Sequence, residues 1–131
     1  MSLSDYFSNA KGAGVLATAD AEGNVDAAVY ARPHVIDEET VAFIMADRTS
    51  RGNLQSNPHA AYLFMEDGDA YVGKRLYLTK VREQSDPEKI RALRRRPPPK
   101  ECEPEAGTKR FLVTFRVDRV RPLVGDGGTA A

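Results

Sequence analysis

The stretch TVAFIMADRTSRGNLQSNPHAAYLFME, residues 40–66, holds two apolar runs around a short polar segment. The runs, TVAFIM and HAAYLFME, do not alternate between apolar and polar residues, which is typical of strands buried on both faces. Pro58 stands just before the second run, and the residue that precedes a proline avoids helical backbone angles. The stretch therefore predicts two buried strands joined by a helix of about two turns.

The polar segment between the runs, ADRTSRGNLQSNP (46–58), allows two interpretations. In the first, the start of the helix binds a phosphate group, because a helix N-terminus carries unpaired N–H donors and a partial positive charge. The hydroxyls of Thr49 and Ser50 would add donors. The guanidinium of Arg48 or Arg51 would add a planar fork that suits phosphate oxygens.

In the second interpretation the same residues only cap a surface helix, since Asp47, Thr49 and Ser50 are all good N-cap residues. Such a short helix gains little from its own propensity, with Leu54 as its one apolar anchor and Gly52 in its first turn. Something else must hold it in place. The stretch by itself leaves both interpretations open.

A hairpin is expected before this stretch, in VLATADAEGNVDAAVYARPHVI (15–36). Gly23 and Asn24 supply the positive backbone angles that a tight turn requires. The second arm alternates, so one side is expected to face the core and the other to be partly polar. The expected core side carries Val25, Ala27, Val29, Ala31 and Val35, and the other side carries Asp26, Tyr30, Arg32 and His34.

Two more strands are expected after the stretch, AYVGKRLYLTKVRE (70–83) and KRFLVTFRVDRVRPLV (109–124). Helices are expected over 3–11 and 85–96, a Pro-rich loop over 97–108 and a flexible tail over 125–131. The 131 residues are enough for one domain with one core. Six short antiparallel strands would leave free edges, which closure into a barrel removes.

Composition limits the classes of function. Nineteen basic and nineteen acidic side chains cancel, so no net field attracts nucleic acid or an anionic membrane. The basic run RRRPPPK (94–100) has acidic neighbours and no interleaved aromatic residue for base stacking, which disfavours nucleic-acid binding. Two histidines and the single Cys102 give no metal-binding spacing and no intrachain disulfide.

No segment approaches the roughly 18 apolar residues of a membrane span, and the N-terminal residues lack the apolar core of a signal peptide. The expected location is therefore the cytoplasm.

The hairpin, the buried strand, the polar RTS turn (48–50) and NLQSNPHAAYLF (53–64) together resemble the FMN-binding split barrels of the pyridoxamine-5′-phosphate oxidase-like family. The similarity is best over 14–65, and the order of strands extends it over nearly the whole chain. The resemblance implies a mainly β, six-stranded antiparallel split β-barrel with short flanking helices. It also implies a homodimer with its flavins at the subunit interface.

The resemblance further assigns cofactor-binding residues. In the family the FMN phosphate is held at the junction of strand and helix, and the matching positions are Arg48, Thr49 and Ser50, with Asn53 close behind. The isoalloxazine ring lies along backbone that matches Val29, Tyr30, Ala31 and Arg32, then Met45 and Ala46. If a flavin lies there, Arg32 could stabilise negative charge near the pyrimidine end of the reduced ring.

Departures from the pyridoxamine oxidases narrow the reaction. Those enzymes carry an Arg-Lys pair after the serine, a tryptophan and an Arg-x-His element near the C-terminus, whereas this chain has Arg51-Gly52 and no tryptophan. Oxidation of pyridoxine phosphate is therefore not expected. The prediction is an FMN-dependent oxidoreductase acting on an unidentified small molecule, with no residue singled out as catalytic. The alternative is a carrier that binds a flavin, a deazaflavin or haem without turnover.

Overall fold

A computed structural model of the chain describes residues 2–88, 90 and 110–125. The expected Pro-rich loop at 97–108 lies outside the described residues, as does the expected tail at 125–131 apart from Gly125. Of the helix expected over 85–96, the described part shows that helical residues begin at Pro87.

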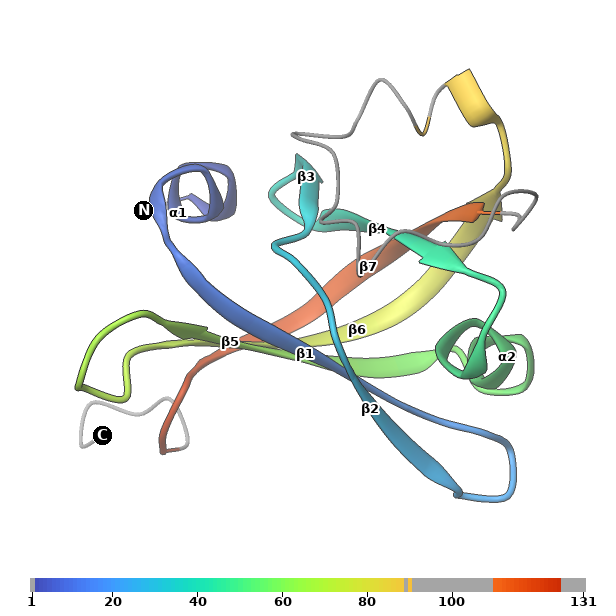
Figure 1. The fold of residues 1–131 in the computed structure, drawn as a ribbon, viewed down its shortest axis with the longest axis horizontal. Helices are drawn as coiled ribbons and strands as arrows, with labels where there is room; N and C mark the ends of the chain where they lie inside the picture. Colours follow the sequence, from blue (N-terminus) through green and yellow to red (C-terminus); the bar gives the residue numbers. More distant parts are fainter. Residues whose placement is uncertain (1, 89, 91–109, 126–131) are drawn as a thin grey trace.

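The described elements are mostly strands. In chain order they are α1 (Leu3–Asn9), β1 (Gly12–Ala19), β2 (Val25–Val29), β3 (His34–Asp37), β4 (Thr40–Ala46), α2 (Thr49–Ser56), β5 (His59–Glu66), β6 (Gly73–Gln84) and β7 (Arg110–Pro122). The strands pair antiparallel in one seven-stranded sheet of order β2-β1-β5-β6-β7-β4-β3. The sheet curves around a common core, with α1 and α2 at opposite ends (Figure 1). The predicted mainly β, antiparallel split-barrel class is confirmed.

The second arm of the expected hairpin forms two strands, so the sheet has seven strands and not six. Pro33 falls between β2 and β3, and a proline has no N–H for a strand ladder and restricts the residue before it. As a result β2 pairs with β1 at one end of the sheet and β3 pairs with β4 at the other. Residues 30–33 connect these two ends, where the barrel is split.

In β2 and at Tyr30, the side of the second arm that faces the core is the opposite of the predicted one, whereas Val35 of β3 packs against the core as predicted. Val25 and Val29, predicted to lie inside, are 82% and 81% exposed, whereas Tyr30 packs against the core. The Tyr30 ring lies edge-on to Phe43, with 5.8 Å between the ring centres. An aromatic ring buries more apolar area than valine or alanine does, so this side of the arm turns inward.

The two apolar runs TVAFIM and HAAYLFME, which form β4 and β5, differ in burial. β4 is buried on both faces, as predicted: Phe43 and Met45 face the main core, and Ala42 packs with Leu112 in a second, smaller cluster. β5 is covered on one face only, contrary to the prediction.

On the covered face of β5, Tyr62 and Phe64 are fully buried. On the other face, Leu63 and Met65 remain exposed. No element of the described chain packs over that face because α1, α2 and the main core all lie on the opposite side of the strand. An unbroken apolar run like that of β5 is typical of a strand covered on both faces. The described residues of one copy of the chain cover only one face of β5.

The turn of the β1–β2 hairpin depends on Asp20 and Gly23. Gly23 has a φ of 88°, but no described residue other than glycine has a positive φ, so the prediction for Asn24 is wrong. The carboxylate of Asp20 instead accepts hydrogen bonds from the backbone N–H of Glu22 and Asn24, both at 2.9 Å. These bonds hold the turn with only one left-handed residue.

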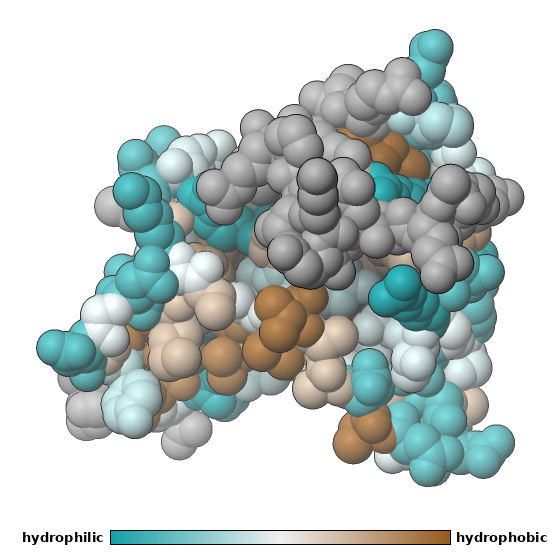
Figure 2. Space-filling model, viewed as in Figure 1, coloured by the Kyte–Doolittle hydropathy of each residue, from teal (hydrophilic) through white to brown (hydrophobic). Residues whose placement is uncertain are grey.

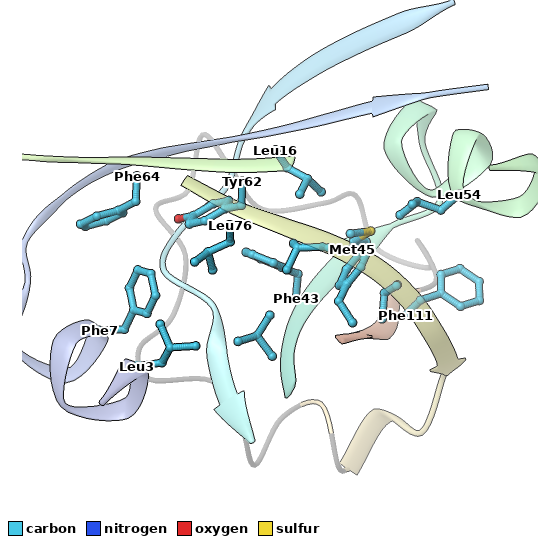
Figure 3. Close-up of a cluster of buried hydrophobic side chains, with 14 residues drawn as sticks. Leu3, Phe7, Leu16, Phe43, Met45, Leu54, Tyr62, Phe64, Leu76 and Phe111 are labelled. Carbon is cyan, nitrogen blue, oxygen red and sulfur yellow. The ribbon is translucent and has the colours of Figure 1, made fainter. Parts of the chain in front are cut away.

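The main core fills the space between the sheet and the two helices (Figure 3). α1 begins at the Ser2 cap, whose side chain accepts a hydrogen bond from the backbone N–H of Asp5 at 3.0 Å. Its buried residues Leu3 and Phe7 enter the core at one end, and Leu54 of α2 enters at the other. The buried members of the core are Leu3, Phe7, Leu16, Val41, Phe43, Met45, Leu54, Tyr62, Phe64, Leu76, Leu78, Phe111, Val113 and Phe115.

Candidate functional site

The candidate site is the N-terminal end of α2, where the chain leaves β4. α2 contacts β1, β2 and β4 and buries Leu54 and Ser50. Gly52 lies on its open side, where an added Cβ would meet no protein atom within 4 Å. The helix is only two turns long, so its position depends on side-chain contacts with the strands.

Arg51 provides the first of these contacts. Its Nη2 lies 2.6 Å from Oε2 of Glu83 on β6, and its Nη1 lies 3.1 Å from Oδ1 of Asp47. The guanidinium carbon sits 3.7 Å from the centre of the Phe111 ring on β7, a distance suited to a cation–π contact. Arg51 is therefore held by the protein itself, which leaves Arg48 as the guanidinium available to a ligand.

Glu83 joins α2 to β6 through further hydrogen bonds. Besides Arg51, its carboxylate accepts from Nε2 of Gln55 at 3.0 Å and from Nζ of Lys80 at 3.3 Å. The bond with Arg51, followed by those with Gln55 and Lys80, lowers the pKa of Glu83 to about 2 against the opposing effect of burial. This network of hydrogen bonds holds the short helix α2 in place, and no bound anion is required for that purpose.

The N-terminal end of α2 lacks the side-chain cap that the second sequence interpretation requires. The N-cap residue is Arg48, whose side chain makes no capping hydrogen bond, and the carboxylate of Asp47 bonds to Arg51 instead. Among the described residues, no acceptor receives the N–H groups of Thr49, Ser50 and Arg51. Three donors at the positive end of the helix are thus left for solvent or a ligand.

Four of the predicted site residues meet at this end: Tyr30, Arg48, Thr49 and Ser50. Burial raises the pKa of the Tyr30 phenol, while a hydrogen bond with Ser50 and the positive charge of Arg48 act in the opposite direction. Ser50 is only 4% exposed, whereas Arg48 and Thr49 are exposed. The end of α2 therefore combines the buried Ser50 hydroxyl and the half-buried Tyr30 hydroxyl with an exposed guanidinium.

Other predicted residues lie beside this group. Asn53 donates from Nδ2 to Oγ1 of Thr18 at 3.0 Å, which fixes α2 against β1. The side chain of Met45 is fully buried in the core, so only its backbone can meet a ligand, and the carbonyl oxygen of Ala46 accepts from the N–H of Arg48 at 2.9 Å.

The backbone from Val29 to Arg32 leads from β2 toward β3 and α1 (Figure 1), and the structure gives the Arg32 side chain a role that the sequence did not suggest. Its Nη1 donates to the carbonyl oxygens of Phe7 at 2.7 Å and Ala10 at 2.8 Å. Those carbonyls end α1, where a positive charge is favourable. This guanidinium therefore braces α1.

The sequence analysis did not identify two residues that support the site. Glu83 anchors α2 from β6, and the buried Tyr62 donates to backbone carbonyls between β2 and β3. No sequence motif marks Glu83. For Tyr62 a signal existed, because a tyrosine in an apolar run has a hydroxyl that must find a partner.

The described residues contain no group of three or more His, Cys, Asp or Glu side chains that could hold a metal ion. No helix within those residues combines the length and the apolarity that crossing a membrane demands.

Comparison with known proteins assigns the family. The family model for pyridoxamine 5′-phosphate oxidase matches residues 5–122, so the chain belongs to this family. Among curated proteins, no sequence matched the chain significantly.

Solved structures share the fold. An FMN-binding protein from Syntrophomonas wolfei matches with a TM-score of 0.75 and 14% identity, over 93% of this chain and 84% of that one. Group A Streptococcus HupZ matches with a TM-score of 0.67 and 20% identity, over 92% and 90%. An F420 reductase matches with a TM-score of 0.65 and 17% identity, over 85% and 90%. Identities this low establish a common fold and nothing more specific.

Proposed function

We propose that this chain is an FMN-binding flavoprotein whose α2 N-terminus holds the cofactor phosphate. The observation that carries the proposal is the uncapped start of α2, where three N–H donors, the Ser50 and Tyr30 hydroxyls and the Arg48 guanidinium gather. These groups suit a phosphate because they combine hydrogen-bond donors with positive charge. Membership of the family and the likeness to an FMN-binding protein support the same choice of ligand.

The protein would bind and orient the cofactor through a few groups. Arg48, Thr49 and Ser50 would hold the phosphate, with Asn53 keeping α2 in place against β1. The backbone at 29–32, together with that of Met45 and Ala46, would receive the ring. FMN, when bound, would supply the electron- or hydride-transfer chemistry.

Replacing Arg48 and Thr49 by alanine together should weaken FMN binding by about 1–3 kcal/mol, the scale of one charge-assisted hydrogen bond or two. Both side chains are exposed, so the double variant should unfold at the same urea concentration as the parent. A fluorescence titration of FMN measures the affinity. The control is Arg82→Ala, which removes an exposed guanidinium from β6. Equal affinities for the double variant and the parent would place the phosphate elsewhere.

We further propose that the flavoprotein is an oxidoreductase for a small molecule other than pyridoxine phosphate. The absence of any tryptophan argues against the substrate contacts of the pyridoxamine oxidases. The alternative is a carrier that holds a flavin, a deazaflavin or haem without turnover. The visible spectrum of purified protein separates the ligands, and its bleaching by a nicotinamide cofactor plus reoxidation by an acceptor separates an enzyme from a carrier.

We also propose that the chain forms a homodimer through the uncovered face of β2, β1 and β5. Val29, Val15 and Leu63 stand in one cross-strand row on this face. Val15 and Leu63 also line a hollow of about 300 Å³, together with Tyr77 and other residues. Figure 2 shows hydrophobic residues gathered in the lower half of the visible face, over the strands. A contiguous apolar face of this kind is a common protein–protein contact.

The substitution Leu63→Glu should convert the dimer into a monomer, because the charge would be buried against an apolar partner surface. Sedimentation velocity at micromolar concentration measures the change. Ile36→Glu is the matched control, since Ile36 is 48% exposed on β3 at the far end of the sheet. A parent protein that sediments as a monomer, or equal effects of both substitutions, would exclude this face as the interface.

A further inference from the structure

Tyr62 lies inside the main core, yet its hydroxyl contacts the backbone that joins β2 to β3. The side chain is fully buried, and Figure 3 shows its ring among the other aromatic residues of the core. The hydroxyl donates to the carbonyl oxygen of Tyr30 at 3.1 Å and to that of Ala31 at 3.0 Å. One phenol hydrogen is thus shared between two consecutive carbonyl groups.

These two contacts fix the direction of the neighbouring N–H groups. The described chain contains no cis peptide, and a trans peptide points its C=O and N–H in opposite directions. Because the Tyr30 carbonyl points at the buried hydroxyl, the N–H of Ala31 points away from the core. Ala31 is exposed, and its N–H has no acceptor among the residues described.

The contacts on either side of Ala31 do not fix the orientation of the peptide between Tyr30 and Ala31. Tyr62 is the residue that sets it. On one side, the N–H of Tyr30 donates to the carbonyl oxygen of Gly14 at 3.0 Å and completes the pairing with β1. On the other side, Arg32 is tied to the end of α1 through its side chain. Ala31 itself belongs to no strand, so no ladder fixes its peptide plane.

We infer that Tyr62 is a positioning residue, which turns the peptide between Tyr30 and Ala31 so that the Ala31 N–H is presented to the flavin ring. The inference rests on the proposed function, in which the ring lies along this backbone. The edge of a flavin ring carries carbonyl oxygens and unprotonated nitrogens that accept such a hydrogen bond. A donor fixed before binding costs less to order than one that must be turned.

Tyr62→Phe tests the inference, with Tyr6→Phe as the matched control. Both substitutions remove one phenol hydroxyl, and the Tyr6 hydroxyl donates to Oε2 of Glu66 at 2.5 Å, away from the segment at 30–32. Tyr62→Phe should raise the dissociation constant of FMN about fivefold to tenfold and shift the visible spectrum of the bound flavin, since it frees one hydrogen-bonded peptide. Tyr6→Phe should leave both unchanged.

A second measurement does not depend on the flavin. In the protein without ligand, the ¹H–¹⁵N amide signals of Ala31 and Arg32 should move in Tyr62→Phe and stay in place in Tyr6→Phe. Unmoved signals, or equal losses of FMN affinity in both variants, would overturn the inference. A parent protein that binds no FMN, with moved amide signals in Tyr62→Phe, would overturn the proposed function while supporting the hold of Tyr62 on this backbone.

Discussion

Replacement of Gly14 by alanine is expected to lower the free energy of unfolding by about 3 kcal/mol, the upper part of the usual range for overpacking. A Cβ at this position would lie 2.0 Å from Oη and 2.4 Å from Cζ of Tyr62. The Tyr62 ring cannot easily withdraw, because it is fully buried and its centre lies 4.9 Å from that of Phe43. Urea denaturation monitored by circular dichroism measures the loss.

Gly52→Ala is the control for the general effect of replacing a glycine. The Cβ at Gly52 meets nothing within 4 Å, and the residue lies in a helix, so this variant should gain about 0.5–1 kcal/mol. The substitution Tyr62→Leu removes the ring that Gly14→Ala would strike. If Gly14→Ala costs as much in the Tyr62→Leu background as in the parent, the clash with Tyr62 is not its cause.

The elements of the fold that could be predicted from the sequence are those that local chemistry determines. The sequence predicted a helix over 3–11, and the structure confirms it as α1, which begins at the Ser2 cap and buries Leu3 and Phe7. The unbroken apolar run of β4 correctly predicted burial on both faces. Each of these signals depends on residues that are close together in the sequence.

The inward side of β2 could not be predicted in the same way. Alternation separates two faces of a strand, but it does not say which face meets the core. The choice depends on the Tyr30 ring finding Phe43, and on Pro33 dividing the arm so that β2 and β3 reach opposite ends of the sheet. Both depend on tertiary contacts, which the alternation of residues along the strand does not reveal.

The candidate site was likewise only partly predictable from the sequence. The composition at 47–50 pointed to the N-terminus of α2, and the structure leaves that end uncapped and beside Tyr30. The residues that hold the site lie far away in the sequence: Glu83 is 32 positions from Arg51, and Tyr62 is 31 positions from Ala31. Only the pairing of strands brings these residues into contact.

The largest effect of acid on stability is expected from Glu83. Its pKa is about 2 in the folded protein, below the ordinary value of 4.5, chiefly because of the hydrogen bond from Arg51. Between these two values the unfolded chain binds more protons than the folded chain does. The stability that Glu83 contributes is therefore fully present above pH 4.5 and is lost progressively as the pH falls toward 2.

Glu83→Gln should therefore lower the free energy of unfolding by about 2 kcal/mol at pH 7, because it leaves the Arg51 guanidinium without its carboxylate partner. The difference between variant and parent should shrink as the pH is lowered from 5 to 3.5 in urea titrations, since the unfolded parent chain then binds a proton at Glu83 that the folded chain does not. Asp69→Asn, at an exposed carboxylate in the β5–β6 loop, is the control and should cost little at any pH. A loss that stays constant over this pH range would mean that the carboxylate of Glu83 does not anchor α2 through its charge. A normal stability together with weakened FMN binding would instead mean that Glu83 acts on the start of α2 without stabilising the fold.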